Sequence, residues 1–169
     1  MKDKPKKKKR SVMYAAIVVG VVIIGMSIFF VYSSEQAKMR GQSFGKAIEF
    51  LQEDLKKQTH LFDSKVSMFK QEHIGKDEFL DFAEKYENEM EKIILRYDNL
   101  QTPNPFMPSM ELFKLSAETQ FEADKYVIKW IRTGDETAQI RSDSFYYQSL
   151  QYEQAALLEF NLIQRQSNP

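Results

Sequence analysis

Residues 13–32 read MYAAIVVGVVIIGMSIFFVY, a run of 20 residues without a charged side chain. A helix rises about 1.5 Å per residue, so this run is about 30 Å long and matches the hydrocarbon thickness of a bilayer. The basic run from Lys4 to Arg10 directly precedes it. Because basic residues beside a membrane helix stay on the cytoplasmic side, we expect residues 1–10 to be a cytoplasmic tail. Residues 11–32 are then the transmembrane helix of a single-pass cell-membrane protein, and the C-terminal domain is extracytoplasmic.

The apolar run predicts an uncleaved signal anchor rather than a secretory signal peptide. Signal peptides have an apolar stretch of about 7 to 15 residues followed by small residues at the cleavage site. Here the stretch is longer, and the sequence after it, Val-Tyr-Ser at 31–33, is a poor cleavage site. Aromatic rings suit the two membrane interfaces, and basic side chains suit anionic lipid head groups. The residues that we expect to anchor the chain in the lipid bilayer are Tyr14, Tyr32, Lys7, Lys8, Lys9 and Arg10.

The net charge of zero conceals a strong asymmetry between the two ends of the chain. Seven basic residues and one Asp give residues 1–10 a net charge of +6, and the other 17 basic and 23 acidic residues give −6. An acidic domain argues against nucleic-acid binding, which needs a basic surface. The chain has no cysteine, so an exported domain must be held together by core packing alone.

Past residue 33 the apolar residues recur at steps of three and four, which is typical of amphipathic helices. Residues 33–43 contain few apolar side chains and are predicted to form a stalk. The first helical stripe consists of Phe44, Ile48, Leu51, Leu55, Phe62, Val66 and Phe69. The second consists of Phe79, Phe82, Tyr86, Met90, Ile93, Tyr97 and Leu100.

Two further stripes follow a proline-rich break at residues 101–108, QTPNPFMP. The third helix is predicted to open at Ser109 and to bury Phe113, Ala117, Phe121, Val127, Ile128 and Ile131. The fourth is predicted to bury Ile140, Phe145, Leu150, Ala155, Leu158 and Leu162.

Turn and capping residues separate these helices. Gly75 is expected to end the first helix and Asp77 to cap the second, while Gly134 ends the third and Asp135 caps the fourth. No stretch alternates strictly between apolar and polar residues, so no sheet is predicted. The fold class is therefore all-α, with a single transmembrane helix followed by an antiparallel four-helix bundle at residues 44–169.

Catalytic and metal-binding patterns are weak in this sequence. His60 and His73 are its two histidines, and neither completes the Glu-x-x-His motif of di-metal bundles. His60 and Asp63 share a helix face but supply only half of a metal site. There is no cysteine nucleophile, Gly-x-Ser-x-Gly turn or phosphate-binding glycine pattern. We expect no enzymatic activity, no cofactor and no metal.

Three side chains that fall off the helix stripes are the candidates for partner binding. Phe106 and Met107 lie in the proline-rich segment, where they either dock a partner or fold back over the end of the bundle. Tyr146 belongs to the cluster SFYYQSLQY at 144–152, whose consecutive aromatic residues cannot all face one core.

These observations favour a membrane-anchored, non-enzymatic extracytoplasmic module. It would bind a protein partner of unknown identity or act as an accessory subunit of a membrane complex. The alternative is a sensory bundle that binds a small ligand, which requires a cavity between the helices.

Overall fold

A computed structural model of the chain describes the backbone of residues 6–167 and the side chains of residue 36 and residues 39–166. The chain divides after Arg40 into two compact units, Met1–Arg40 and Gly41–Pro169. The predicted span at 11–32 and its six anchoring residues lie outside the residues whose side chains are described. Among the residues whose side chains are described, no helical stretch is both long enough and apolar enough to cross a membrane.

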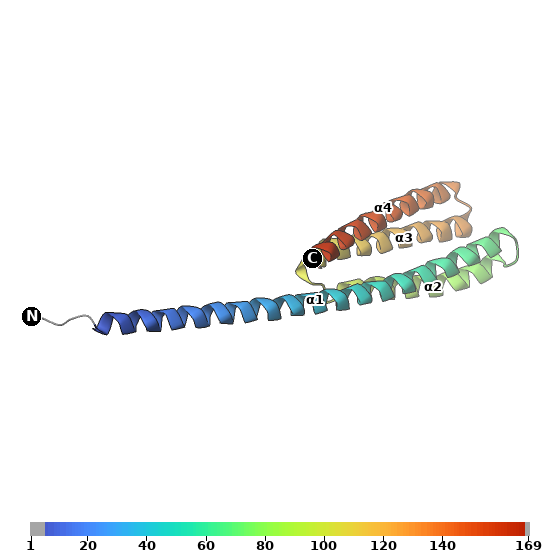
Figure 1. The fold of residues 1–169 in the computed structure, drawn as a ribbon. Helices are drawn as coiled ribbons and strands as arrows, with labels where there is room; N and C mark the ends of the chain where they lie inside the picture. The colour runs from blue at the N-terminus through green and yellow to red at the C-terminus, as the bar shows by residue number, and fades with distance from the viewer. Residues whose placement is uncertain (1–5, 168–169) are drawn as a thin grey trace, which may run out of the picture. The chain divides into compact units, whose positions relative to one another are not determined.

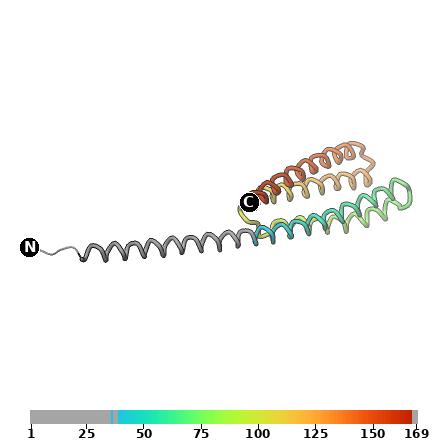
Figure 2. The backbone as a smooth tube through the Cα atoms, viewed as in Figure 1, coloured from blue at the N-terminus to red at the C-terminus, as the bar shows by residue number. Residues whose placement is uncertain are grey.

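The fold is all-helical, as predicted. Its α-helices are α1 (Lys6–Lys70), α2 (Lys76–Asp98), α3 (Met107–Thr133) and α4 (Glu136–Ser167), and a short 3-10 helix, η1 (Asn104–Phe106), precedes α3 (Figure 1). Residues 6–167 contain no strand. Figure 2 traces the second unit as a helical bundle, in which α2 folds back along the end of α1 and α4 folds back along α3.

The turn between α1 and α2 differs from the prediction. Glu72, not Gly75, adopts the left-handed conformation that stops α1, with φ of 59°. The amide of Glu72 donates to the carbonyl of Phe69, and the amide of His73 donates to that of Met68, as in a Schellman motif. Gly75 is extended and immediately precedes α2, so Asp77 lies inside the first turn instead of capping it.

The third helix begins two residues earlier than the predicted start at Ser109. η1 starts at Asn104 and α3 follows at Met107, and each carries a proline in its first turn. Proline fits there because the first amides of a helix have no helical acceptor. Ser109 is buried, and its hydroxyl donates to the carbonyl of Phe106 at 2.9 Å.

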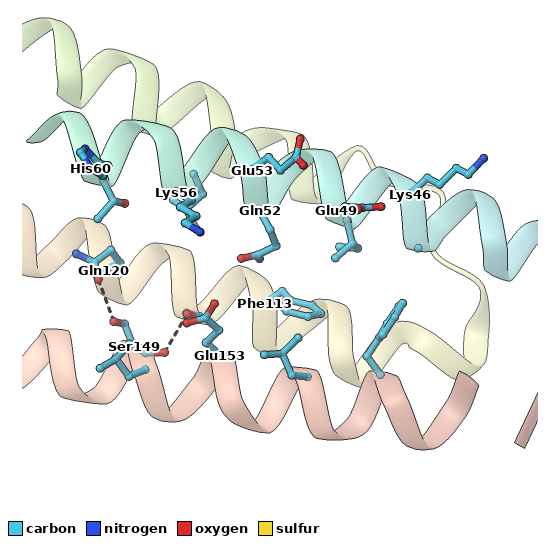
Figure 3. Close-up of a pocket in the computed structure, with 18 of the residues that line it drawn as sticks. Lys46, Glu49, Gln52, Glu53, Lys56, His60, Phe113, Gln120, Ser149 and Glu153 are labelled. Atoms are coloured by element: carbon cyan, nitrogen blue, oxygen red, sulfur yellow. Dashed lines mark hydrogen bonds between the residues drawn. The ribbon is translucent and has the colours of Figure 1, made fainter. Parts of the chain in front are cut away.

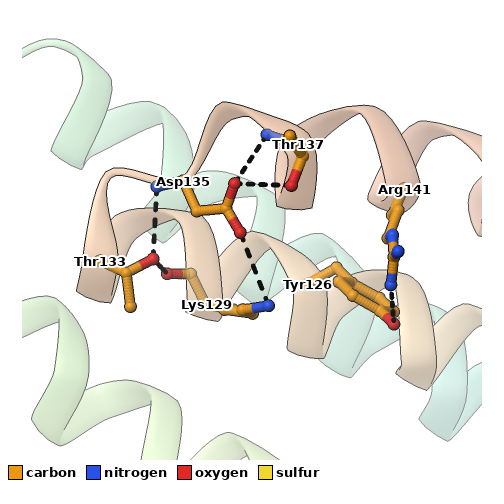
Figure 4. Close-up of polar contacts among 6 residues, drawn as sticks. All are labelled: Tyr126, Lys129, Thr133, Asp135, Thr137 and Arg141. Carbon is orange, nitrogen blue, oxygen red and sulfur yellow. Dashed lines mark hydrogen bonds and ion pairs between the residues drawn. The ribbon is translucent and has the colours of Figure 1, made fainter.

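The boundary between α3 and α4 matches the prediction. Gly134 ends α3 with φ of 74°, and its amide donates to the carbonyl of Trp130 at 2.7 Å. Asp135 then caps α4, because its Oδ1 accepts hydrogen bonds from the amide and the hydroxyl of Thr137 (Figure 4). These bonds, together with Lys129, hold the pKa of the Asp135 carboxyl below its usual range.

The central core is an aromatic cluster built from α1, α2 and α3. Phe62 of α1 stacks on Tyr86 of α2 with ring centroids 4.5 Å apart and lies 6.1 Å from Phe79. Phe121 of α3 approaches Tyr86 edge-on at 6.5 Å. The predicted stripe of α2 is confirmed for five of its residues, which are buried: Phe79, Tyr86, Met90, Ile93 and Tyr97.

The predicted stripe of α4 is largely wrong. Ile140, Leu158 and Leu162 are exposed. The buried residues of α4 are Ala138, Ser142, Ser149, Ala156 and Ile163. Four of these five are small, and α4 lies in extensive contact with α3 along this face. Because small side chains let two helix backbones approach closely, α4 packs through them and turns larger apolar residues outward.

Candidate functional site

A groove of about 930 Å³ lies between α1 on one side and the α3–α4 hairpin on the other, within the second unit. Its α1 wall runs from Gln42 to Asp63, which is about 31 Å along a helix. Its α4 wall runs from Tyr146 to Gln164. Phe113, Ser116 and Gln120 of α3 contribute to its floor. The groove therefore extends along much of the α1 segment that belongs to the second unit.

Aromatic rings close one end of the groove. Phe44 of α1, Phe106 of η1 and Phe160 of α4 lie with ring centroids 5.3 to 6.2 Å apart. Two glycines of α1 admit these rings. A Cβ at Gly41 would lie 3.3 Å from the Phe106 ring, and one at Gly45 would lie 3.4 Å from the Phe160 ring. A side chain at Gly41 would therefore press on the Phe106 ring, whereas one at Gly45 would just touch the Phe160 ring.

A polar network lies beneath the middle of the groove. The Tyr86 hydroxyl donates to one oxygen of the buried Asp124 carboxyl. Gln120 Nε2 donates to the other oxygen at 2.9 Å. The Ser149 hydroxyl of α4 lies 3.1 Å from Gln120 Oε1 and 2.7 Å from the Tyr146 carbonyl oxygen, and it shares its one proton between these two acceptors. Ser116 donates to the Ser149 carbonyl at 2.9 Å. The network joins α2, α3 and α4.

The Asp124 carboxyl is the electrostatic centre of this network. Burial raises its pKa to about 7, and the hydrogen bonds from Tyr86 and Gln120 only partly oppose that shift. Burial and the nearby Asp124 charge also raise the pKa of the Tyr86 hydroxyl. Asp124 therefore changes charge near neutral pH, just below a groove that solvent reaches.

The rim of the groove carries charges of both signs. Gln52 and Lys56 point from α1 into the groove, opposite Ser149 and Glu153 on α4 (Figure 3). The charged residues along the rim are Lys46, Glu49, Glu53, Lys56, Asp63 and Glu153, and His60 lies among them. Apolar side chains lie between them and on the inner walls: Ile48, Leu55, Phe113, Leu150, Leu157 and Phe160. An apolar interior with a charged, hydrated rim is the usual layout of a protein-binding surface.

The three predicted partner-binding residues are not brought together. Phe106 is only 5% exposed, so it folds back and closes the bundle end, and its proposed role as a surface docking residue is corrected. Met107 is 41% exposed and does not line the groove. Tyr146 is 44% exposed and does line it. Whether Met107 and Tyr146 bind a partner stays a prediction.

The pair His60 and Asp63, which the sequence offered as half of a metal site, also lies at this groove. However, the described residues contain no group of three or more His, Asp and Glu side chains placed to hold a metal ion.

The groove itself was not predicted from the sequence. A signal was present, since Ser116, Gln120 and Asp124 recur every fourth residue and place a polar column on one face of α3.

No known protein family, curated protein or solved structure matches this chain.

Proposed function

We propose that this chain is a membrane-anchored, non-enzymatic extracytoplasmic module whose groove binds an amphipathic helix of a protein partner. The anchor rests on the basic tail and the 20-residue apolar run of the sequence, which favour a single-pass helix with a cytoplasmic N-terminus. The folded unit then follows the transmembrane segment as an antiparallel four-helix bundle on the outer side of the membrane.

The groove between α1 and α4 is the observation that carries this proposal. The α1 wall of the groove is about 31 Å long, which matches the length of a helix of about 20 residues. Its apolar walls suit the apolar face of such a helix, and its charged rim suits polar flanks of either sign. A partner helix with Leu or Phe at three- and four-residue spacing, flanked by acidic and basic residues, matches both properties.

Site-specific photo-crosslinking in the native membrane tests the proposal. A photoreactive residue at position 157, which lines the groove, should capture a helical segment of another protein. Position 148 is the control, because Gln148 also belongs to α4, is exposed, and does not line the groove. The proposal fails if position 157 captures nothing beyond what position 148 captures.

Substitution of two groove residues gives a second readout. Tyr146 and Leu157 both line the groove and are both partly exposed, so replacing them with Ala should leave the melting temperature nearly unchanged. It should weaken retention of the captured partner about tenfold, because apolar anchors dominate helix-in-groove binding. Full retention by a folded double variant contradicts the proposed groove.

A small amphipathic ligand is the second candidate occupant. The polar network beneath the groove favours it, because Gln120 and Ser149 both line the groove and offer hydrogen-bonding groups. Mass spectrometry of the chain purified from its native membrane distinguishes the two. A bound small molecule without a crosslinked protein segment at position 157 supports the ligand.

A further inference from the structure

Four large apolar side chains of α4 are left uncovered by the other residues whose side chains are described. Ile140 is 70% exposed, Tyr147 68%, Leu158 68% and Leu162 53%. Their spacings of 7, 11 and 4 residues place all four on one face of the helix. Ala156 and Ser149 are buried on the opposite face, against α3. We call these four residues the outer stripe of α4.

The outer stripe is separate from the groove. None of its four residues lines the groove, whose α4 wall includes Tyr146, Leu150 and Leu157 on a neighbouring face. The stripe runs from Ile140 to Leu162, which is 22 residue steps or about 33 Å of helix. It consists of two apolar pairs, Ile140 with Tyr147 and Leu158 with Leu162, and the exposed Gln151 lies between them. Exposed apolar residues gathered on one helix face mark an interaction surface.

The charges at the two ends of the outer stripe are self-complementary. If a second α4 lies antiparallel against the first with Ile140 opposite Leu162, then Gln151 lies at the two-fold axis. Glu136 then lies within one residue of Arg165 of the partner copy. The two-fold axis repeats this pair, so two opposite-charge contacts flank the apolar stripe.

The parallel arrangement lacks this complementarity. It would place Glu136 beside Glu136 of the partner copy and Arg165 beside Arg165, so like charges would meet at both ends. Within the described residues, Glu136, Glu159 and Arg165 form no ion pair inside the chain. Their side chains are thus available to a second copy.

We propose that the outer stripe binds a second copy of this chain, with the two α4 helices packed antiparallel. A lipid surface fits the stripe less well, because helices that lie on membranes carry basic polar faces, whereas acidic Glu136, Asp143 and Glu159 accompany this one. A single helix face is a small interface, so the dimer should dissociate on dilution. This proposal is independent of what occupies the groove.

Disulfide crosslinking tests the register, because the chain has no native cysteine. Two differently tagged full-length chains, Ile140→Cys and Leu162→Cys, are mixed in a mild detergent and oxidised gently. Detergent leaves both helix directions free to form. The antiparallel dimer predicts a strong crosslink in the mixture and little in either chain alone, since two copies of position 140 lie about 33 Å apart.

Two results overturn the proposal. A crosslink of Ile140→Cys to itself as strong as that in the mixture would show parallel packing. The control is a chain with Leu95→Cys, an exposed position on α2. If the mixture gives no higher crosslink yield than this control, the stripe is not an interface. Leu157→Ala in the groove should leave the crosslink yield unchanged. The dimer and the groove can therefore be contradicted independently of each other.

Charge reversal provides the second measurement. Arg165→Glu should raise the dimer dissociation constant about fivefold or more, because it puts two like-charge pairs at the ends of the stripe. Adding Glu136→Arg to the same chain should restore the dimer, which light scattering at several protein concentrations measures. Both residues are exposed, so the fold should persist, and circular dichroism checks this. A double reversal that remains as weak as the single one contradicts the antiparallel register.

Discussion

Helices α2 and α4 bury opposite kinds of side chain. α2 buries large ones, among them Phe79, Tyr86 and Tyr97. α4 buries small ones such as Ala138 and Ala156 and exposes large apolar residues on its outer stripe. Both helices are amphipathic in sequence, so apolar spacing alone does not identify the buried face. The size of the side chains on each face, and the distance to the neighbouring helix, decide which face is inside.

The largest expected effect lies on the α2 side of this comparison. Met90 is fully buried, so Met90→Ala should reduce the free energy of unfolding by about 2 to 5 kcal/mol through lost burial and a cavity. Urea denaturation followed by circular dichroism measures this. An effect below about 1 kcal/mol would mean that the core tolerates loss of its large residues, and the contrast between α2 and α4 would weaken.

The pH dependence of stability tests the network in which α2, α3 and α4 meet. The folded pKa of Asp124 is raised to about 7, so ionising it costs more in the folded than in the unfolded chain. Its contribution is therefore favourable below about pH 4 and is lost as the pH rises toward 7. The free energy of unfolding should fall over this range by up to about 4 kcal/mol.

Asp124→Asn supplies the control for that prediction. The amide keeps the size of the side chain but does not ionise, so the variant should lose most of the decline between pH 4 and pH 7. Urea denaturation at pH 4.5 and pH 7.5, on both proteins, gives the comparison. Equal pH dependence in the two proteins would assign the effect to other carboxyls.

The small face of α4 should not accept a larger residue. Ala156 is fully buried, so Ala156→Leu should cost about 1 to 3 kcal/mol by forcing α4 away from its neighbours. Ala155→Leu, one position along the same helix and less buried, is the matched control. Equal tolerance at both positions would show that close packing of α4 does not depend on small side chains.

The smallest effect is expected on the outer stripe. Leu158→Ala should change the free energy of unfolding of the monomer by no more than about 0.5 kcal/mol, because the side chain is exposed. Thermal unfolding at low protein concentration, where a dimer dissociates, measures it. A loss comparable to that of Met90→Ala would place Leu158 in the core and restore the stripe predicted from the sequence.

The candidate site was only partly predictable. Tyr146 was identified because three consecutive aromatic residues cannot share one helix face, and it does line the groove. For Phe106 the sequence left two alternatives open, docking a partner or folding back over the end of the bundle, and its 5% exposure shows the second. In the fold, Gly41 leaves space for its ring, and Gly41 lies 65 residues away in sequence. A contact between such distant residues leaves no local pattern to read.

The all-helical class, the boundary at Gly134 and Asp135, and the buried face of α2 follow from the amino-acid sequence alone. These features depend on local capping, on backbone freedom and on one dominant row of large apolar residues. The buried face of α4 and the groove between α1 and α4 follow only from the packing of the helices in three dimensions. Both features depend on how closely two helices approach each other. Where a neighbouring backbone lies near, only small side chains fit between the helices, and the larger side chains turn outward.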